Sequence, residues 1–239
     1  DSSTSRGLGD VYKRQHKMLD KIINEKKLKA NGIIGFYPAN SINDDDIEVY
    51  ADDKSSEPIF TYYGLRQQTQ KPTIKGIQKP NICLADYISP KESGIKDYIG
   101  LFAVTSGINA EVYEKIFEKS EDDYNGIMIK AITDRLAEAF AEYMHDRVRK
   151  DLWGYQPKKL SNKEMIEEKY EGIRPAPGYP ACPEHTVKGD IFSLLQAKEI
   201  GMTLTESMAM YPASSVSGFY FAHPDAVSYT HLTLPTIYS

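Results

Sequence analysis

The chain has 239 residues, a formal net charge of −5, 41% hydrophobic residues and 26% charged residues. This length accommodates one large domain or two small ones, and one large domain is the expectation. The composition is typical of a folded globular protein and excludes a disordered one. Lysines and arginines are interspersed with acidic residues, so no basic stripe indicates a nucleic-acid partner.

Targeting signals are not evident either. No apolar run approaches the roughly 18 residues that a membrane-spanning helix needs, and the N-terminus lacks an apolar signal core. We therefore expect a soluble, cytoplasmic protein with no membrane partner. Its two cysteines, Cys83 and Cys182, are expected to be reduced thiols.

Apolar residues spaced by three or four predict five helices in chain order. The first contains Met18–Ile23 and ends near Asn31, and the second contains Ile108, Val112 and Ile116. The longest is predicted from about 124 to 150. A short helix follows between the capping box of Ser161 with Glu164 and a stop at Gly172, and the last, around 191–195, ends at Gly201.

Six apolar runs predict strands. They cover residues 33–37, 47–51, 59–63, 98–104, 203–211 and 216–222. Between the last two, the turn Pro212-Ala-Ser-Ser predicts an antiparallel hairpin, with Leu204, Met208 and Met210 on one face of its first strand. Strands mixed with helices in this order indicate an α+β fold.

The two ends of the chain differ from its middle. Residues 1–15 and 227–239 carry little amphipathic pattern and do not continue the neighbouring elements. We interpret both as non-native flanks, which leaves residues 16–226 as the domain.

The segment with the strongest chemical signal is the loop Gly172–His185, which holds four prolines within nine positions. Each proline fixes its own φ and biases the residue before it toward extended geometry. A stiff loop of this kind loses little entropy on binding a ligand. Arg174 can grip a carboxylate through two parallel N–H donors, Gly178 permits close backbone approach, and the ring of Tyr179 can face a cation or stack on a base. The alternative is a surface loop with a solvated arginine.

Other polar residues have weaker signals. Cys182 and His185 suggest a metal or nucleophile site, but a zinc site needs about four ligands and no second Cys/His pair exists. Glu138 is a candidate functional residue, but a carboxylate between Arg135 and Glu142 on a helix is far more often part of a solvated face, and His145 and His223 are equally weak candidates. Asp86 fits a cap. Neither a GxxxxGK[ST] phosphate loop nor a GxGxxG fingerprint is present, which argues against nucleoside triphosphates and doubly wound dinucleotide sites.

The loop sequence Arg174-Pro-Ala-Pro-Gly-Tyr179, continuing to Thr186, resembles the signature of the activation domain of cobalamin-dependent methionine synthases. Further segments match the family in the same order, over about residues 16–226: Gly35–Asn40, Leu65–Gln68, Leu84–Tyr87, Asp134–Tyr143, Leu204–Met210, Ala213–Phe221 and His223–Asp225. The resemblance implies a C-shaped α+β domain with a central antiparallel sheet, outside the doubly wound class.

The resemblance also implies a function. The family domain binds S-adenosylmethionine and supports the reductive remethylation of cob(II)alamin to methylcobalamin, with cobalamin carried by a neighbouring domain and electrons from flavodoxin or a flavoprotein reductase. In this chain Arg174 would pair with the ligand carboxylate. Ala176, Gly178 and Tyr179 would line the pocket, and Glu138 would reach the amino group through water. No catalytic residue and no metal ligand is implied.

This sequence departs from the family at its edges. A ligand-binding aspartate of the family lies N-terminal to every matched segment, and a tyrosine pair follows the position of Asp225. Ser228 and Tyr229 fall near that pair but lie in the flank. Two other functions stay open at this point: a docking module for flavodoxin and the cobalamin domain, and a hydrolase or metal protein built on Cys182 and His185.

Overall fold

The computed structural model describes residues 2–26, 28–68, 73–74, 77–78, 80–156, 158, 160–167, 169–224 and 226. Residue contacts divide the chain into two compact units. Unit 1 comprises Asp1–Gly32, Val104–Tyr143 and Ala197–Val216, and unit 2 comprises Ile33–Ala103, Met144–Gln196 and Ser217–Ser239. None of the described helices is both long and apolar enough to cross a membrane.

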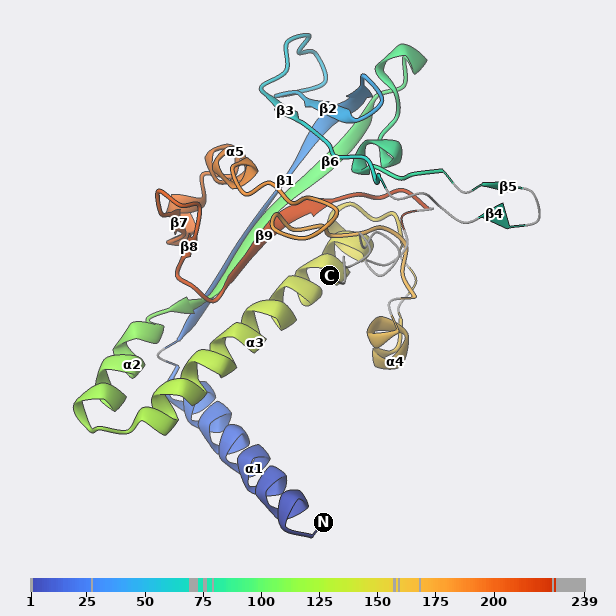
Figure 1. Cartoon of the computed structure of the whole chain (residues 1–239). Helices are drawn as coiled ribbons and strands as arrows, with labels where there is room; N and C mark the ends of the chain where they lie inside the picture. Colours follow the sequence, from blue (N-terminus) through green and yellow to red (C-terminus); the bar gives the residue numbers. More distant parts are fainter. Residues whose placement is uncertain are drawn as a thin grey trace. The chain divides into compact units, whose positions relative to one another are not determined.

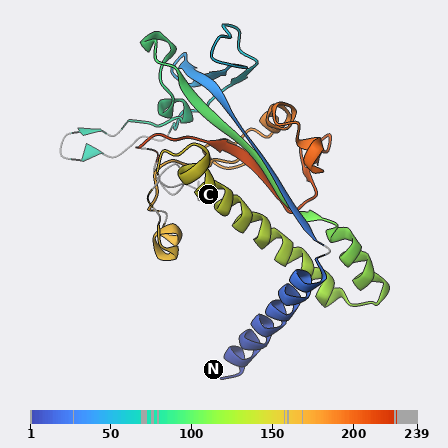
Figure 2. The same ribbon diagram turned by 180° about the vertical axis from the view of Figure 1, so that it is seen from behind.

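The fold is α+β, as predicted, and its main sheet has five strands in the order β3-β2-β1-β6-β9 (Figure 1). Strand β2 pairs antiparallel with both β1 and β3, and Figure 2 shows the same order from behind. The strands are β1 (Lys29–Ile42), β2 (Asp46–Val49), β3 (Phe60–Tyr62), β6 (Asp97–Ile108) and β9 (Ser215–Tyr220). Five of the six predicted strands are thereby confirmed.

The predicted hairpin between 203–211 and 216–222 is wrong. Residues 203–211 fold back on themselves as a small hairpin of β7 (Thr203–Leu204) and β8 (Met210–Tyr211). The side chain of Thr205 accepts a hydrogen bond from the Ala209 amide at 3.1 Å, and Met208 adopts a φ of 62°. A local side-chain turn therefore interrupts the alternating pattern that predicted one long strand, and β9 joins the main sheet instead. A further small sheet contains β4 (Thr73–Ile74) and β5 (Ile77–Gln78).

The helices of unit 1 share an apolar core. It contains residues of α1 (Ser2–Glu25), α2 (Ala110–Lys119) and α3 (Asp123–Arg147), namely Met18, Ile22, Tyr113, Phe117, Met128, Ile129 and Ile132. The predicted face of α2 is wrong. Val112 and Ile116 are about half exposed, because the larger Tyr113 and Phe117 occupy the core.

The predicted limits of the helices are partly confirmed. Helix α1 ends at Glu25, before the predicted end, because β1 begins at Lys29. It begins at Ser2, within the segment 1–15, and the non-native origin of that segment stays a prediction; residues 227–239 lie outside the described part. The capping box of Ser161 and Glu164 is confirmed at α4 (Asn162–Ile166), and α5 (Val187–Leu194) is followed by the 3-10 helix η4 (Ala197–Ile200).

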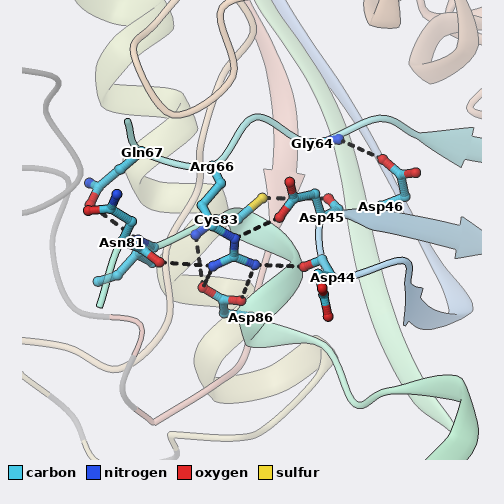
Figure 3. A network of polar contacts seen from close by, with 10 residues as sticks. Asp44, Asp45, Asp46, Gly64, Arg66, Gln67, Asn81, Cys83 and Asp86 are labelled. Carbon is cyan, nitrogen blue, oxygen red and sulfur yellow. Dashed lines mark hydrogen bonds and ion pairs between the residues drawn. The ribbon is translucent and has the colours of Figure 1, made fainter. Parts of the chain in front are cut away.

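Unit 2 is held together near β2 by one guanidinium group (Figure 3). Arg66 donates to both carboxylate oxygens of Asp86 at 2.8 Å, to Asp45 at 2.7 Å, and to the carbonyl oxygens of Asp44 and Asn81 at 2.7 and 2.9 Å. These five bonds use all five guanidinium hydrogens. Asp86 also accepts from the Cys83 amide at 2.9 Å, so it belongs to the capping box of the 3-10 helix η1 (Leu84–Tyr87) and is not the strand-end cap that the sequence suggested. The segments matched as Leu65–Gln68 and Leu84–Tyr87 are thus one structural cluster.

Replacing Arg66 by lysine should lower the free energy of unfolding by about 1–3 kcal/mol, because an ammonium group offers three donors where five acceptors converge. Urea denaturation of the whole chain measures this change in the free energy of unfolding. Arg147→Lys is the matched control, since the Arg147 guanidinium forms an exposed pair with Asp151 at 2.6 Å, a type worth about 0–1 kcal/mol. Equal losses of unfolding free energy in the two variants would show that the Arg66 cluster stabilises the chain no more than an exposed ion pair does.

Candidate functional site

The stem of the proline-rich loop is paired with the end of β9. Ile173 and Phe221 exchange two backbone hydrogen bonds of 3.0 Å, and the Phe219 amide donates to the Pro175 carbonyl at 3.0 Å. The backbones approach so closely that a Cβ on Gly218 would lie 2.2 Å from the Pro175 oxygen. The stem therefore behaves as an additional short strand, and only glycine fits at position 218.

The tip of the loop is a tight turn. The Gly178 amide donates to the Cys182 carbonyl at 2.8 Å, and the Cys182 amide donates to the Tyr179 carbonyl at 2.9 Å. Gly178 has a φ of 98°, which disfavours any side chain, and a Cβ there would lie 2.5 Å from the His185 ring. The ring of Tyr179 is 52% exposed. The tip thus offers an open backbone and an aromatic face to a ligand.

The tip rests on the cluster that Arg66 organises. Pro180 and Ala181 line a small cavity together with Leu65, Gln67 and Cys83. Gln67 is fixed there, because its backbone N–H donates to the Ile82 carbonyl at 3.1 Å and its side-chain oxygen accepts from the Ile82 backbone N–H at 3.3 Å. The proline-rich loop is therefore supported at its stem by β9 and at its tip by the Leu65–Gln67 segment.

Four of the five predicted ligand residues lie on this loop in unit 2. Arg174 and Ala176 are half-buried, whereas Gly178 and Tyr179 are exposed. The fifth, Glu138, is an exposed residue of α3 in unit 1. Its participation in the same site stays a prediction.

Cys182 and His185 do not have the properties of a nucleophilic pair. Cys182 is 1% exposed, and burial raises the pKa of its thiol to about 11. A thiol with that pKa is protonated at neutral pH and is a poor nucleophile. In the described part of the chain, no group of three or more His, Cys, Asp or Glu side chains is placed to hold a metal ion.

A buried histidine, His145, was only an ambiguous candidate in the sequence. His145 is fully buried at the end of α3, stacked on Tyr220 with ring centroids 5.3 Å apart and edge-on to Tyr170 at 5.2 Å. Its Nε2 lies 3.2 Å from the hydroxyl of Tyr155. His145 continues the buried four-residue spacing of Ala137 and Ala141, so the helical period could have identified it as an interior polar residue.

The charges of two arginines act on the pKa of this histidine. Burial, followed by the charges of Arg149 and Arg174, lowers the pKa of His145 well below its ordinary value. Arg149 is 1% exposed, with its guanidinium 4.0 Å from the centre of the Tyr170 ring and 3.2 Å from Asp146. The imidazole is therefore neutral and adds no charge of its own beside Arg174.

Together these features define a class of protein: an α+β ligand-binding domain that presents an arginine, glycine backbone and an aromatic ring on one proline-stiffened loop. The sequence matches the family described as "Vitamin B12 dependent methionine synthase, activation domain" over residues 2–234. It is also similar to a crystal structure described as the MetH reactivation domain bound to AdoHcy. Sequence identity is 53%, the TM-score is 0.86, and the match covers 93% of this chain and 67% of that one.

The chain belongs to the activation-domain family of vitamin B12-dependent methionine synthases, because the family match spans nearly its whole length. It is accordingly a domain of a methyltransferase. The resemblance of the chain to this family, predicted from its sequence, is confirmed.

Because His145 is buried as a neutral imidazole, the chain should lose stability at acidic pH. Its pKa is lowered in the folded state, so below an unfolded value of about 6.5 the unfolded chain binds a proton that the folded chain does not. This histidine should make the free energy of unfolding fall by about 1.4 kcal/mol per pH unit below that value, until the folded pKa is reached. Urea denaturation at pH 7.0 and 5.5 measures the slope.

His145→Phe removes the titrating group while keeping an aromatic ring between Tyr170 and Tyr220. The acid sensitivity of the variant should be shallower than that of the original chain. Identical slopes in the two proteins would show that His145 is not buried as the neutral form.

Proposed function

We propose that the chain binds S-adenosylmethionine on the proline-rich loop, with Arg174 pairing with the ligand carboxylate. The observation that carries this proposal is the position of Arg174 between two fixed points: Ile173 is paired with Phe221, and the Pro175 carbonyl with the Phe219 amide. Because the backbone on both sides of Arg174 is fixed, little backbone entropy is lost when its guanidinium binds a carboxylate through two parallel N–H donors. The similar MetH reactivation domain was crystallised with AdoHcy, the demethylated form of this ligand.

The other loop residues suit the remainder of the ligand. The backbone around Ala176 and Gly178 is open to an adenosyl group, and the exposed Tyr179 ring provides a π-face for the sulfonium or for the adenine. The family resemblance adds Glu138, whose carboxylate would bind the ligand ammonium through water. The donor set therefore fits a ligand that has both charge signs and a flat aromatic part.

Within the whole enzyme, this domain supports the reductive remethylation of cob(II)alamin to methylcobalamin. S-adenosylmethionine supplies the methyl group on an already activated sulfonium, so this chain needs no acid or base and contributes by binding and orienting the donor. The cobalamin is held by a neighbouring domain, and flavodoxin or a flavoprotein reductase supplies the electron. The isolated chain does not turn over alone. Its place of action is the cytoplasm.

A second proposal, inferred from the sequence, is a docking module that binds these partners with little affinity for the ligand. Cross-linking to flavodoxin and to the cobalamin domain, with and without ligand, separates the two. Docking that is independent of S-adenosylmethionine, with no binding of the ligand itself, supports the second function.

Arg174→Ala should weaken S-adenosylmethionine binding about 10- to 100-fold, because a charge-assisted bond in a half-buried site contributes about 1.5–3 kcal/mol. The affinity of Arg174→Lys should lie between those of the original chain and Arg174→Ala, since lysine keeps the charge and loses the bidentate geometry. Isothermal titration calorimetry on the whole chain measures the change. Arg14→Ala, at an exposed arginine of α1, is the control. Unchanged affinity in Arg174→Ala would refute the site.

A further inference from the structure

A buried chain of contacts leads from α3 to the ligand loop. His145 Nε2 is 3.2 Å from the Tyr155 hydroxyl, and that hydroxyl is packed so tightly against Gly172 that a Cβ there would lie 2.6 Å from it. Gly172 has a φ of 82°, so its conformation depends on the absence of a side chain as well as on this contact. The next residue but one is Arg174. The position of the Tyr155 hydroxyl therefore limits where the loop stem can begin.

The His145 ring is itself held from two sides. Tyr220 stacks on it at an interplanar angle of 18°, Tyr170 meets it at 85°, and Phe102 also stacks on Tyr220, with ring centroids 4.6 Å apart. Tyr220 lies between Phe219 and Phe221, the two residues of the β9 segment that pair with the stem. The same aromatic stack thus fixes the imidazole and the strand to which the loop is bonded.

We propose that His145 is a positioning residue of the ligand loop: its imidazole holds the Tyr155 hydroxyl against Gly172 and so sets the place at which Arg174 presents its guanidinium. A carboxylate side chain at position 145 would compete with the ligand for Arg174. A charged imidazole there would repel the Arg174 guanidinium. A neutral hydrogen-bonding ring does neither. This inference rests on the proposed binding of the ligand carboxylate by Arg174.

The test compares His145→Phe, His145→Gln and Tyr155→Phe in the 239-residue chain. His145→Phe keeps the stack and removes the polar nitrogen, Tyr155→Phe removes the hydroxyl, and His145→Gln retains a hydrogen-bonding group near the position of Nε2. The two phenylalanine variants should each bind S-adenosylhomocysteine about tenfold more weakly, and the double variant little more weakly than either, because both remove one shared bond. The glutamine variant should recover most of the affinity.

A ligand without a carboxylate separates positioning from general destabilisation. 5′-Methylthioadenosine has the adenosyl part and lacks the amino-acid carboxylate, so its affinity should change less than about twofold in all three variants. Tyr113→Phe, which removes another interior tyrosine hydroxyl, 2.9 Å from Glu25 in unit 1, should leave both affinities unchanged.

The outcomes are distinguishable. If the original chain binds S-adenosylhomocysteine and loses affinity on Arg174→Ala, but His145→Phe and Tyr155→Phe bind it normally, the positioning role is overturned and the proposed function stands. Equal losses for both ligands, or no recovery in His145→Gln, also overturn the role. A chain that binds neither ligand overturns the proposed function itself.

Discussion

The pairing of the loop stem with the end of β9 is the interaction on which the site depends. A loop with four prolines in nine positions has few amides with which to bond itself. The backbone hydrogen bonds between Ile173 and Phe221 and between Phe219 and Pro175 give the stem the partners that it cannot find within the loop. Without them the backbone on both sides of Arg174 would lose its hydrogen-bond partners.

Other features of unit 2 serve this pairing. Gly218 lets the two backbones approach, and the stacked rings of Phe102, Tyr220 and His145 hold β9 from behind. At the other end of the loop, the segment that Arg66 anchors supports Pro180 and Ala181. Dispersion and burial thus stabilise one end and charge-assisted hydrogen bonds the other.

Much of this could be predicted from the sequence, because its signals are local. The long helix, the capping box of Ser161, five strands and the stiffness of the loop follow from periodicity and proline geometry. The predictions failed where distant residues decide the outcome. The core selected Tyr113 and Phe117 over the regularly spaced Val112 and Ile116, and the side chain of Thr205 closed a turn inside an apparent strand. His145 was ambiguous because its role depends on Tyr155 and Tyr220, which no spacing rule places beside it.

The central claim is that a preformed loop presents Arg174 to the carboxylate of an adenosyl ligand. The most direct measurement is a crystal structure of this chain with S-adenosylhomocysteine bound. The account predicts the ligand carboxylate on the Arg174 guanidinium, the adenosyl group along the backbone of Ala176 and Gly178, and an unchanged pairing of Ile173 with Phe221. A ligand bound away from Arg174, or a stem detached from β9, would contradict it.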